Sequence, residues 1–190
     1  RGLGDVYKRQ VYDGAHLHTF MSDQALSEAV AHFRAGEAES RRTGGKLWSV
    51  FATACDVSEE RYLKLIVARL ATYLQIPGYG EALVNVNGWD MDMLKSFRSS
   101  PIVASMTGAI DSVASYAELA EIEKLIPQEW RPAAVGDAKT CALRWLDQFN
   151  AGADGIIIHA STPEEFAPVL DEYERIRPAE LFAQRTNRPG

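Results

Sequence analysis

Three short apolar runs alternate along the chain with longer segments in which apolar residues recur at every third or fourth position. Short apolar runs between turn residues are typical of buried strands, and they fall at residues 13–20, 47–55 and 154–160. The longer segments predict amphipathic helices, at about residues 23–42, 58–75, 116–126, 137–150 and 163–176. This order of strands and helices predicts an α/β protein.

Several predicted helices carry signatures at their ends. Residues 115–118 have the spacing of a capping box, in which the first and last side chains bond each other's backbone amides. Thr162, Pro163 and Glu165 combine a capping threonine, a proline at the first helical position and a second capping box. In the first helix we expect residues 41–42, both arginine, in the last turn and the glycine pair after them to end it.

The spacing of the predicted strands indicates how the sheet is connected. Strands that alternate with helices run parallel and are joined by right-handed crossovers, which leaves an open doubly wound sheet and a (β/α)8 barrel as alternatives. Roughly a hundred residues separate the second strand from the third, whereas a simple crossover needs about a dozen. We therefore expect a helical insertion at about residues 76–132, and in barrels such insertions lie over the C-terminal mouth. Because three strands cannot close an eight-stranded barrel, a barrel would mean that the chain holds its last portion only.

Composition and charge narrow the classes of function. With 46% apolar and 24% charged residues, the chain has the composition of a globular domain. Its net charge of −6 argues against nucleic acid or an anionic membrane as a partner, and no apolar run reaches the roughly 18 residues of a membrane span. Two cysteines without a CxxC motif argue against a disulfide framework or a metal site and predict a protein of the reducing cytoplasm.

The two ends of the chain differ from the part between them. Residues 1–10 have mixed charges, two glycines and no periodicity, so we interpret them as a non-native or disordered leader. Residues 178–190 follow the last predicted helix as a polar stretch, which we expect to be a flexible tail. The candidate domain is therefore residues 11–177.

Three segments of the chain together resemble one known family. They are DGAHLHTF (13–20), TYLQIPGYGEALVNVNGWD (72–90) and CALRWLDQFNAGADGIIIHASTPEEFAPVLDEYERIRP (141–178). In these segments the chain resembles the luciferase-like monooxygenase superfamily, and within it the branch of oxidoreductases that uses the deazaflavin coenzyme F420. The resemblance extends over about residues 11–178, and the middle segment is the most specific part of it.

The resemblance implies a fold, a reaction and a cofactor. The fold is a partial (β/α)8 TIM barrel, in which this chain supplies about strands six to eight with a helical insertion before the last strand. The reaction is hydride transfer between reduced F420 and a small organic substrate, and the alternative is an FMN-dependent monooxygenase of the same superfamily. In this family the earlier strands hold most of the cofactor, so the resemblance implies that this piece is inactive alone. It also implies a homo-oligomer for the full-length protein, and no catalytic motif of the family matches a position here.

His18 and Thr19 lie where the first predicted strand would emerge at the mouth of a barrel, the end at which barrel enzymes place their active sites. A histidine there can donate a hydrogen bond to a cofactor carbonyl, so we predict that His18 and Thr19 contact the cofactor. The alternative is a rim histidine that is bonded to neighbouring backbone. His159 has the corresponding position at the end of the last strand, and Ser161 or Thr162 beyond it is expected to cap the next helix.

Tyr79 and Trp89 belong to an aromatic stretch of the insertion that Gly78 and Gly80 interrupt. Together with Tyr73 they can enclose a planar ring and exclude water. We therefore predict Tyr79 and Trp89 as substrate contacts. The alternative is that these aromatic side chains hold the insertion helices against the rim of the barrel.

Cys55 and Cys141 are the two thiols of the chain. Each falls in an apolar run, and the sequence shows neither a base nor a positive charge placed to activate it. We expect both to be buried and unreactive.

A second class of function also fits the pattern, namely a self-sufficient α/β domain that binds a partner without a cofactor. A truncated barrel leaves the edges and one apolar face of its sheet exposed, whereas a complete small domain covers them. The surroundings of the sheet therefore discriminate between the two classes.

Overall fold

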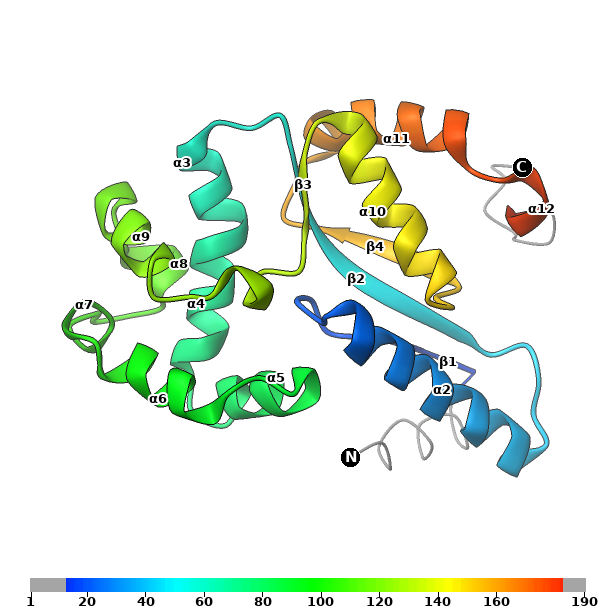
Figure 1. The fold of residues 1–190 in the computed structure, drawn as a ribbon, viewed down its shortest axis with the longest axis horizontal. Coiled ribbons are helices and arrows are strands. Elements are labelled where there is room, and N and C mark those ends of the chain that lie inside the picture. The colour runs from blue at the N-terminus through cyan, green and yellow to red at the C-terminus, as the bar shows by residue number, and fades with distance from the viewer. Residues whose placement is uncertain (1–12, 183–190) are drawn as a thin grey trace.

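The computed structural model describes residues 13–182, and Figure 1 shows how their elements are arranged. Four strands form a parallel sheet: β1 (Gly14–His16), β2 (Lys46–Cys55), β3 (Ala134–Gly136) and β4 (Gly155–His159). The helices beside the sheet are α2 (Asp23–Ser40), α10 (Ala138–Asn150) and α11 (Pro163–Ile176). Between β2 and β3 lie α3 (Glu59–Tyr62), η1 (Leu63–Val67), α4 (Ala68–Gln75), α5 (Tyr79–Asn87), α6 (Met91–Ser99), α7 (Pro101–Ala104), α8 (Ile110–Val113), α9 (Tyr116–Glu123) and η2 (Gln128–Trp130). We call this whole helical segment the insertion; it begins before the predicted 76–132.

β2 is the centre of the sheet. Trp48 pairs with His16 of β1 and also with Gly155 of β4, so β1 and β4 lie on opposite edges of β2. All pairs are parallel, and β1, β2 and β4 follow one another in space as they do in the chain, which is the order of consecutive barrel strands. The short β3 pairs only with Thr53–Cys55 at the carboxyl end of β2.

One prediction about a strand is wrong, and one strand of the sheet is not predicted. Within the predicted strand 13–20, only Gly14–His16 pair with β2. These three residues are largely exposed, whereas the sequence predicts a buried strand. The extended chain cannot continue past Thr19 because Phe20 has a φ of 62°, in the left-handed region. The sequence also does not predict β3, since three residues carry no alternation that would distinguish a strand.

The helices follow the predictions with two exceptions, one at a helix end and one inside a helix. The capping boxes that begin α9 and α11 are confirmed, with Ser115 and Thr162 as the N-caps. The first exception is α2, which ends at Ser40 because Arg41 has a φ of 53°, so Arg41 and Arg42 lie beyond its last turn. The second is the predicted helix 58–75, which contains the π-helical segment η1 between α3 and α4.

The predicted end segments lie largely outside the described residues. This holds for the leader at 1–10 and for residues 183–190 of the predicted tail. Within the tail, Ala179–Phe182 form the short helix α12. Helices fill most of the predicted insertion at 76–132.

The helices α2, α10 and α11 all pack on one face of the sheet (Figure 1). Leu47 and Phe51 of β2 face them and are buried, Leu47 against α2 and Phe51 against α10 and α11. A doubly wound sheet carries helices on both faces, whereas the strands of a barrel carry helices on the outside only. Of the two alternatives, this arrangement favours the barrel.

Among residues 13–182, those that cover the opposite face of the sheet lie near the carboxyl ends of its strands. There Ala52 is buried against the core of the insertion. Towards the amino ends Trp48 and Val50 are half-buried, Ile157 is exposed, and a shallow groove of about 360 Å³ is lined in part by Trp48 and Ile157. The indole of Trp48 lies on Gly155, where a Cβ would come within 2.6 Å of the ring. We call the surface formed by Trp48, Val50 and Ile157 the open face.

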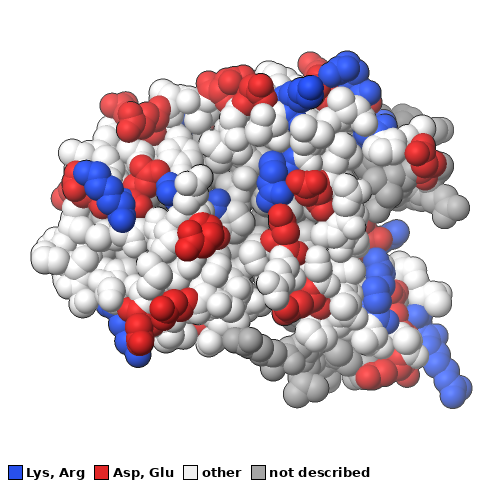
Figure 2. All heavy atoms as spheres, viewed as in Figure 1, with Lys and Arg blue, Asp and Glu red and all other residues white. Residues whose placement is uncertain are grey.

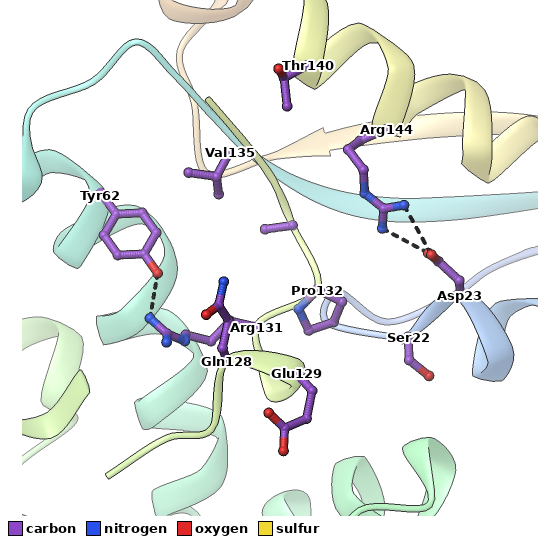
Figure 3. A pocket seen from close by; sticks show the side chains of 11 residues that line it. Ser22, Asp23, Tyr62, Gln128, Glu129, Arg131, Pro132, Val135, Thr140 and Arg144 are labelled. Atoms are coloured by element: carbon purple, nitrogen blue, oxygen red, sulfur yellow. Dashed lines mark hydrogen bonds and ion pairs between the residues drawn. The ribbon is translucent and has the colours of Figure 1, made fainter. Parts of the chain in front are cut away.

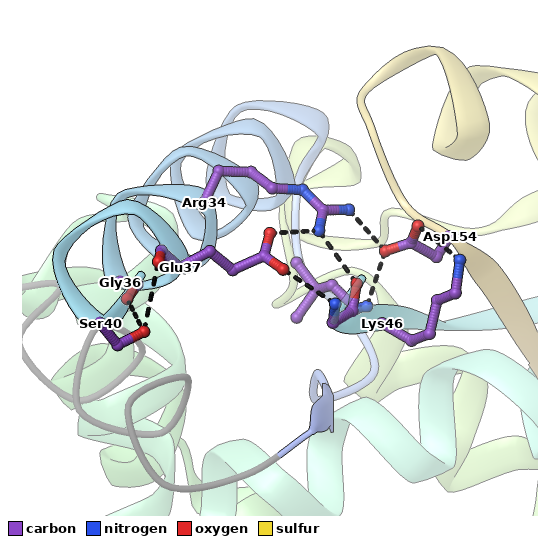
Figure 4. A network of polar contacts seen from close by, with 8 residues as sticks. Arg34, Gly36, Glu37, Ser40, Lys46 and Asp154 are labelled. Carbon is purple, nitrogen blue, oxygen red and sulfur yellow. Dashed lines mark hydrogen bonds and ion pairs between the residues drawn. The ribbon is translucent and has the colours of Figure 1, made fainter. Parts of the chain in front are cut away.

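A network of polar contacts fastens α2 to the amino end of the sheet (Figure 4). Arg34 donates to Asp154 at 2.6 Å, to Glu37 at 2.7 Å and to the carbonyl oxygen of Gly45 at 3.0 Å. Asp154 also accepts the backbone amide of Leu47 at 2.8 Å, and Glu37 accepts that of Gly45 at 2.8 Å. Asp154 lies directly before β4, and Leu47 lies near the start of β2. These bonds therefore fix the positions of both strand starts relative to α2.

The exterior carries charges of both signs. Figure 2 shows acidic and basic side chains interspersed over the face in view, without a large field of one sign. Within residues 13–182, none of the helices combines the length and the apolar character that a membrane crossing requires.

Candidate functional site

The loops that leave the carboxyl ends of β1, β2 and β4 share an unusual backbone conformation. Each contains a residue other than glycine with a positive φ: Phe20 at 62°, Asp56 at 47° and Ala160 at 82°. Such conformations cost of order 1 kcal/mol or more and concentrate at functional sites. In parallel α/β folds the carboxyl ends of the strands are also where ligands bind. We therefore place the candidate site at this edge of the sheet.

His18 is the best-defined polar side chain at this edge. Its Nδ1 lies 2.7 Å from the carbonyl oxygen of Thr19, and its Nε2 lies 2.5 Å from the hydroxyl oxygen of Tyr79. The rings of Tyr73 and Tyr79 meet the imidazole edge-on, at centroid distances of 4.8 and 5.1 Å. Burial lowers the pKa of His18, the nearby His16 lowers it further, and the bond to Thr19 opposes both. The imidazole is therefore held neutral at neutral pH.

Tyr79 reaches His18 because the turn before α5 is tight. Gly78 has a φ of 80°, a conformation that glycine adopts freely. At Gly80 a Cβ would come within 2.6 Å of the carbonyl oxygen of Leu74, so a larger residue would push α5 away from α4. Arg98 braces the same turn by donating to the Leu74 carbonyl at 2.7 Å. The glycines of this stretch thus position Tyr79 at the first turn of α5.

A cavity of about 300 Å³ lies between the β1 loop and α5, and both His18 and Tyr79 line it. Apolar side chains make up most of the remaining wall, contributed by Leu17, Met21, Ala82, Leu83 and Val86. A mainly apolar cavity with a few convergent polar groups is the usual form of a small-molecule site.

Buried polar atoms without a hydrogen-bond partner mark the same edge of the sheet. Among the described residues these atoms are Thr19 Oγ1, His159 Nδ1 and, in the insertion, Arg131 Nε. Burial lowers the pKa of His159, and electrostatic interaction with Arg69 and His18 lowers it further. A buried polar atom without a partner costs about 1–3 kcal/mol, so Thr19 and His159 are groups that a ligand can satisfy.

Trp89 lies apart from this cluster. Its ring stacks on that of Trp130, with centroids 4.8 Å apart and planes 7° from parallel, and it packs against the core of the insertion. It is not part of the wall that Tyr79 shares with His18. The structure thus brings His18, Tyr73 and Tyr79 together, whereas Trp89 stacks on Trp130 within the insertion, and its role as a substrate contact stays a prediction.

The remaining candidate residues from the sequence are buried in the core or bonded to backbone. Cys55 and Cys141 are buried as expected, and burial is the main cause that raises both thiol pKa values, that of Cys141 to about 12. Thr162 is the helix cap, whereas Ser161 donates to the backbone carbonyl of Thr53 and so joins the β4 loop to β2.

A second cavity, which the sequence does not predict, lies outside the sheet near the starts of α2 and α10 (Figure 3). It measures about 480 Å³ and has a polar wall. Both arginines that line it are paired: Arg144 with Asp23 at 3.0 Å, and Arg131 with Glu123 and with the hydroxyl of Tyr62 at 2.8 Å. Residues from distant parts of the chain form it, so no local motif signals it.

No protein-family model matches the chain, and no curated protein sequence matches it. Among solved structures, the coenzyme F420 dependent tetrahydromethanopterin reductase from Methanopyrus kandleri is similar, with a TM-score of 0.61 at 12% sequence identity. The likeness covers 97% of this chain and 47% of that reductase, so the chain spans about half the length of the structure it matches. At this identity the likeness shows a shared fold, which is a mixed α/β fold with a parallel sheet, consistent with part of a TIM-like barrel.

Proposed function

We propose that the chain forms about strands six to eight, with the inserted helices, of a luciferase-like oxidoreductase that transfers hydride between reduced F420 and a small organic substrate. One observation carries this proposal. β1, β2 and β4 follow one another in a parallel sheet with helices on one face, and nearly the whole chain shares its fold with about half of an F420-dependent reductase. In this proposal β1, β2 and β4 are strands six, seven and eight.

The residues at the carboxyl edge fit part of a cofactor site. The unpartnered Thr19 Oγ1 and His159 Nδ1 can bond polar atoms at the edge of a heterocyclic ring, and His18 lies beside them. A bound deazaflavin would supply the hydride. We assign His18 and Thr19 to the cofactor side of the site and Tyr79 to the substrate side, where its ring lines the cavity.

The same proposal implies that this chain alone is inactive. Thr19 and His159 offer hydrogen bonds along one side of a ring, whereas a cofactor of this size needs contacts along its whole length. In a complete barrel, further strands would supply these contacts from the same carboxyl edge. In the alternative, a monooxygenase of the same superfamily, FMN would take the place of F420 and bind at the same carboxyl edge of the sheet.

Reading the coding sequence upstream of the codon for Val11 tests the partial barrel. We expect the reading frame to continue through five further strand–helix units. A stop codon in frame directly before Val11 would overturn the proposal.

Titration of the chain with F420 and with FMN tests the assignment of the cofactor. We expect weak binding, stronger for F420 than for FMN, and weaker in His18→Ala than in the control His32→Ala, which changes a histidine of α2 away from the site. Tight stoichiometric binding of either cofactor would contradict the inactivity of this chain alone, and stronger binding of FMN would favour the monooxygenase.

A further inference from the structure

The bond between His18 and Tyr79 has a direction that the neighbouring backbone sets. A carbonyl oxygen can only accept, so the contact between His18 Nδ1 and the Thr19 carbonyl places the proton of a neutral imidazole on Nδ1. Nε2 then carries a lone pair and accepts. The Tyr79 hydroxyl must donate its proton to Nε2, and its oxygen is left able only to accept a further hydrogen bond.

Tyr79, His18 and His16 are the polar side chains of a cavity whose other lining residues are apolar. Tyr79 and His18 line the cavity on one side, and their hydrogen bond is solvent-exposed. On α5 the residues Ala82, Leu83 and Val86 follow Tyr79 at helical spacing and present one apolar wall, which Leu17 and Met21 oppose from the β1 loop. The volume of about 300 Å³ is at the lower end for small-molecule sites.

We propose that this cavity binds a small, mainly apolar molecule with a single hydrogen-bond donor, such as a hydroxyl group, and that the donor bonds to Tyr79 Oη. The inference rests on the proposed function only in taking Tyr79 as a substrate contact, and binding requires no cofactor. A molecule whose polar atom can only accept, such as a ketone, meets no donor at this position. Selectivity for donors over acceptors is therefore the property that defines the site.

Protonation of His18 reverses this selectivity. A charged imidazole carries a proton on Nε2 and donates it to Tyr79 Oη, which frees the tyrosine proton for an acceptor. Burial places the pKa of His18 below its ordinary 6.5, so the donor-selective state prevails at neutral pH. The titratable groups around the imidazole are His16 of β1, Tyr73 of α4, Tyr79 of α5 and His159 of β4.

Cyclohexanol and cyclohexanone, which differ in this one group, test the inference in NMR titrations of the chain without cofactor. About one pH unit above the His18 pKa, which the same spectra report, we expect cyclohexanol to bind about fivefold more tightly than cyclohexanone. About one unit below it we expect the preference to be lost or reversed. Tyr79→Phe combined with His18→Ala removes both the hydroxyl and the Nε2 lone pair that its loss would expose, so this double variant should abolish the preference at both pH values. Tyr116→Phe, at a similarly exposed tyrosine of α9, should leave it unchanged.

Equal affinities for the two probes above the His18 pKa would overturn the inference, as would a preference that survives in the double variant. The absence of any saturable binding would overturn it as well. Because neither probe titration contains F420, failure of the chain to bind F420 would count against the proposed function alone.

Discussion

The helical insertion and the sheet region bury their apolar residues in different ways. In the insertion, Ile66, Leu70 and Leu74 lie on one central helix and are completely buried by the short helices around it. In the sheet region, helices cover one face and part of the other, and Ile157 and Trp48 remain on the open face. The insertion thus has a core of its own, whereas the sheet region has an apolar surface without a complete cover.

Under the proposed partial barrel, this difference bears on which region of the molecule further polypeptide would cover. Apolar surface that stays in water forgoes about 25 cal/mol per Å² of stabilisation. We therefore expect the insertion to be the more stable part and the sheet region to be the part that associates. The predictions below test this contrast, from the largest effect to the smallest.

Leu70→Ala should have the largest effect because Leu70 lies at the centre of the insertion core. The lost methyl groups and the cavity that remains should lower the free energy of unfolding by about 3 kcal/mol. Urea denaturation monitored by circular dichroism measures it. A loss below about 1 kcal/mol would mean that the insertion core is not tightly packed.

Asp154→Ala should cost about 2 kcal/mol, since it removes the acceptor of the Leu47 amide and the partner of Arg34 at the covered base of the sheet. Asp147→Ala is the matched control. Asp147 pairs with Arg144 on the surface, and its loss should change stability by about 0.5 kcal/mol or less. Equal losses in both variants would contradict the role given to the network.

The ion pair of Arg61 and Glu165 joins α3 of the insertion to α11 beside the sheet, with bonds of 2.7 and 2.9 Å. Bonding to Arg61 lowers the pKa of Glu165 to about 2, from 4.5 in an unfolded chain. Its contribution is therefore complete above about pH 4.5 and is lost as the pH falls through about 2. Because both side chains are partly exposed, we expect this contribution to be only about 0.5 kcal/mol.

Glu165→Gln measures the contribution, because glutamine keeps an acceptor for the capping box and loses the charge. The difference in unfolding free energy between the variant and the unchanged chain should vanish on acidification. A difference that is independent of pH would contradict the assignment.

Ile157→Thr should have the smallest effect on stability, within about 0.5 kcal/mol, because Ile157 is 42% exposed on the open face. Its neighbour Ile158 packs against the covered core, so Ile158→Thr should cost about 2 kcal/mol. Sedimentation velocity should show less self-association in Ile157→Thr than in the unchanged chain. Unchanged association would show that the open face is not the surface through which copies meet.

Features that depend on neighbours in the sequence could be predicted. The capping boxes at Ser115 and Thr162 depend only on residues close in the sequence. β2 and β4 are apolar runs that the local sequence predicts as strands, and only their pairing depends on the rest of the fold. The left-handed turns at Arg41 and Phe20 carry no glycine and therefore give no signal. β3 is too short to show a period.

The candidate site could be predicted only in part, for the same reason. The position of His18 at a strand end follows from local pattern. Its bond to Tyr79 joins residues 61 positions apart, and the stack of Trp89 on Trp130 depends on how the insertion folds back on itself. Sequence proximity grouped Tyr79 with Trp89, whereas tertiary packing separates them.

The contact of Trp48 with Gly155 gives the molecule an optical reporter. Of the four tryptophans, Trp130 and Trp145 are buried and Trp89 is stacked, so Trp48 is the one whose indole faces the open surface of the sheet. Any polypeptide that adds strands there would dehydrate this ring and shift its fluorescence to shorter wavelength. Completion of the sheet can thus be followed in solution without a label.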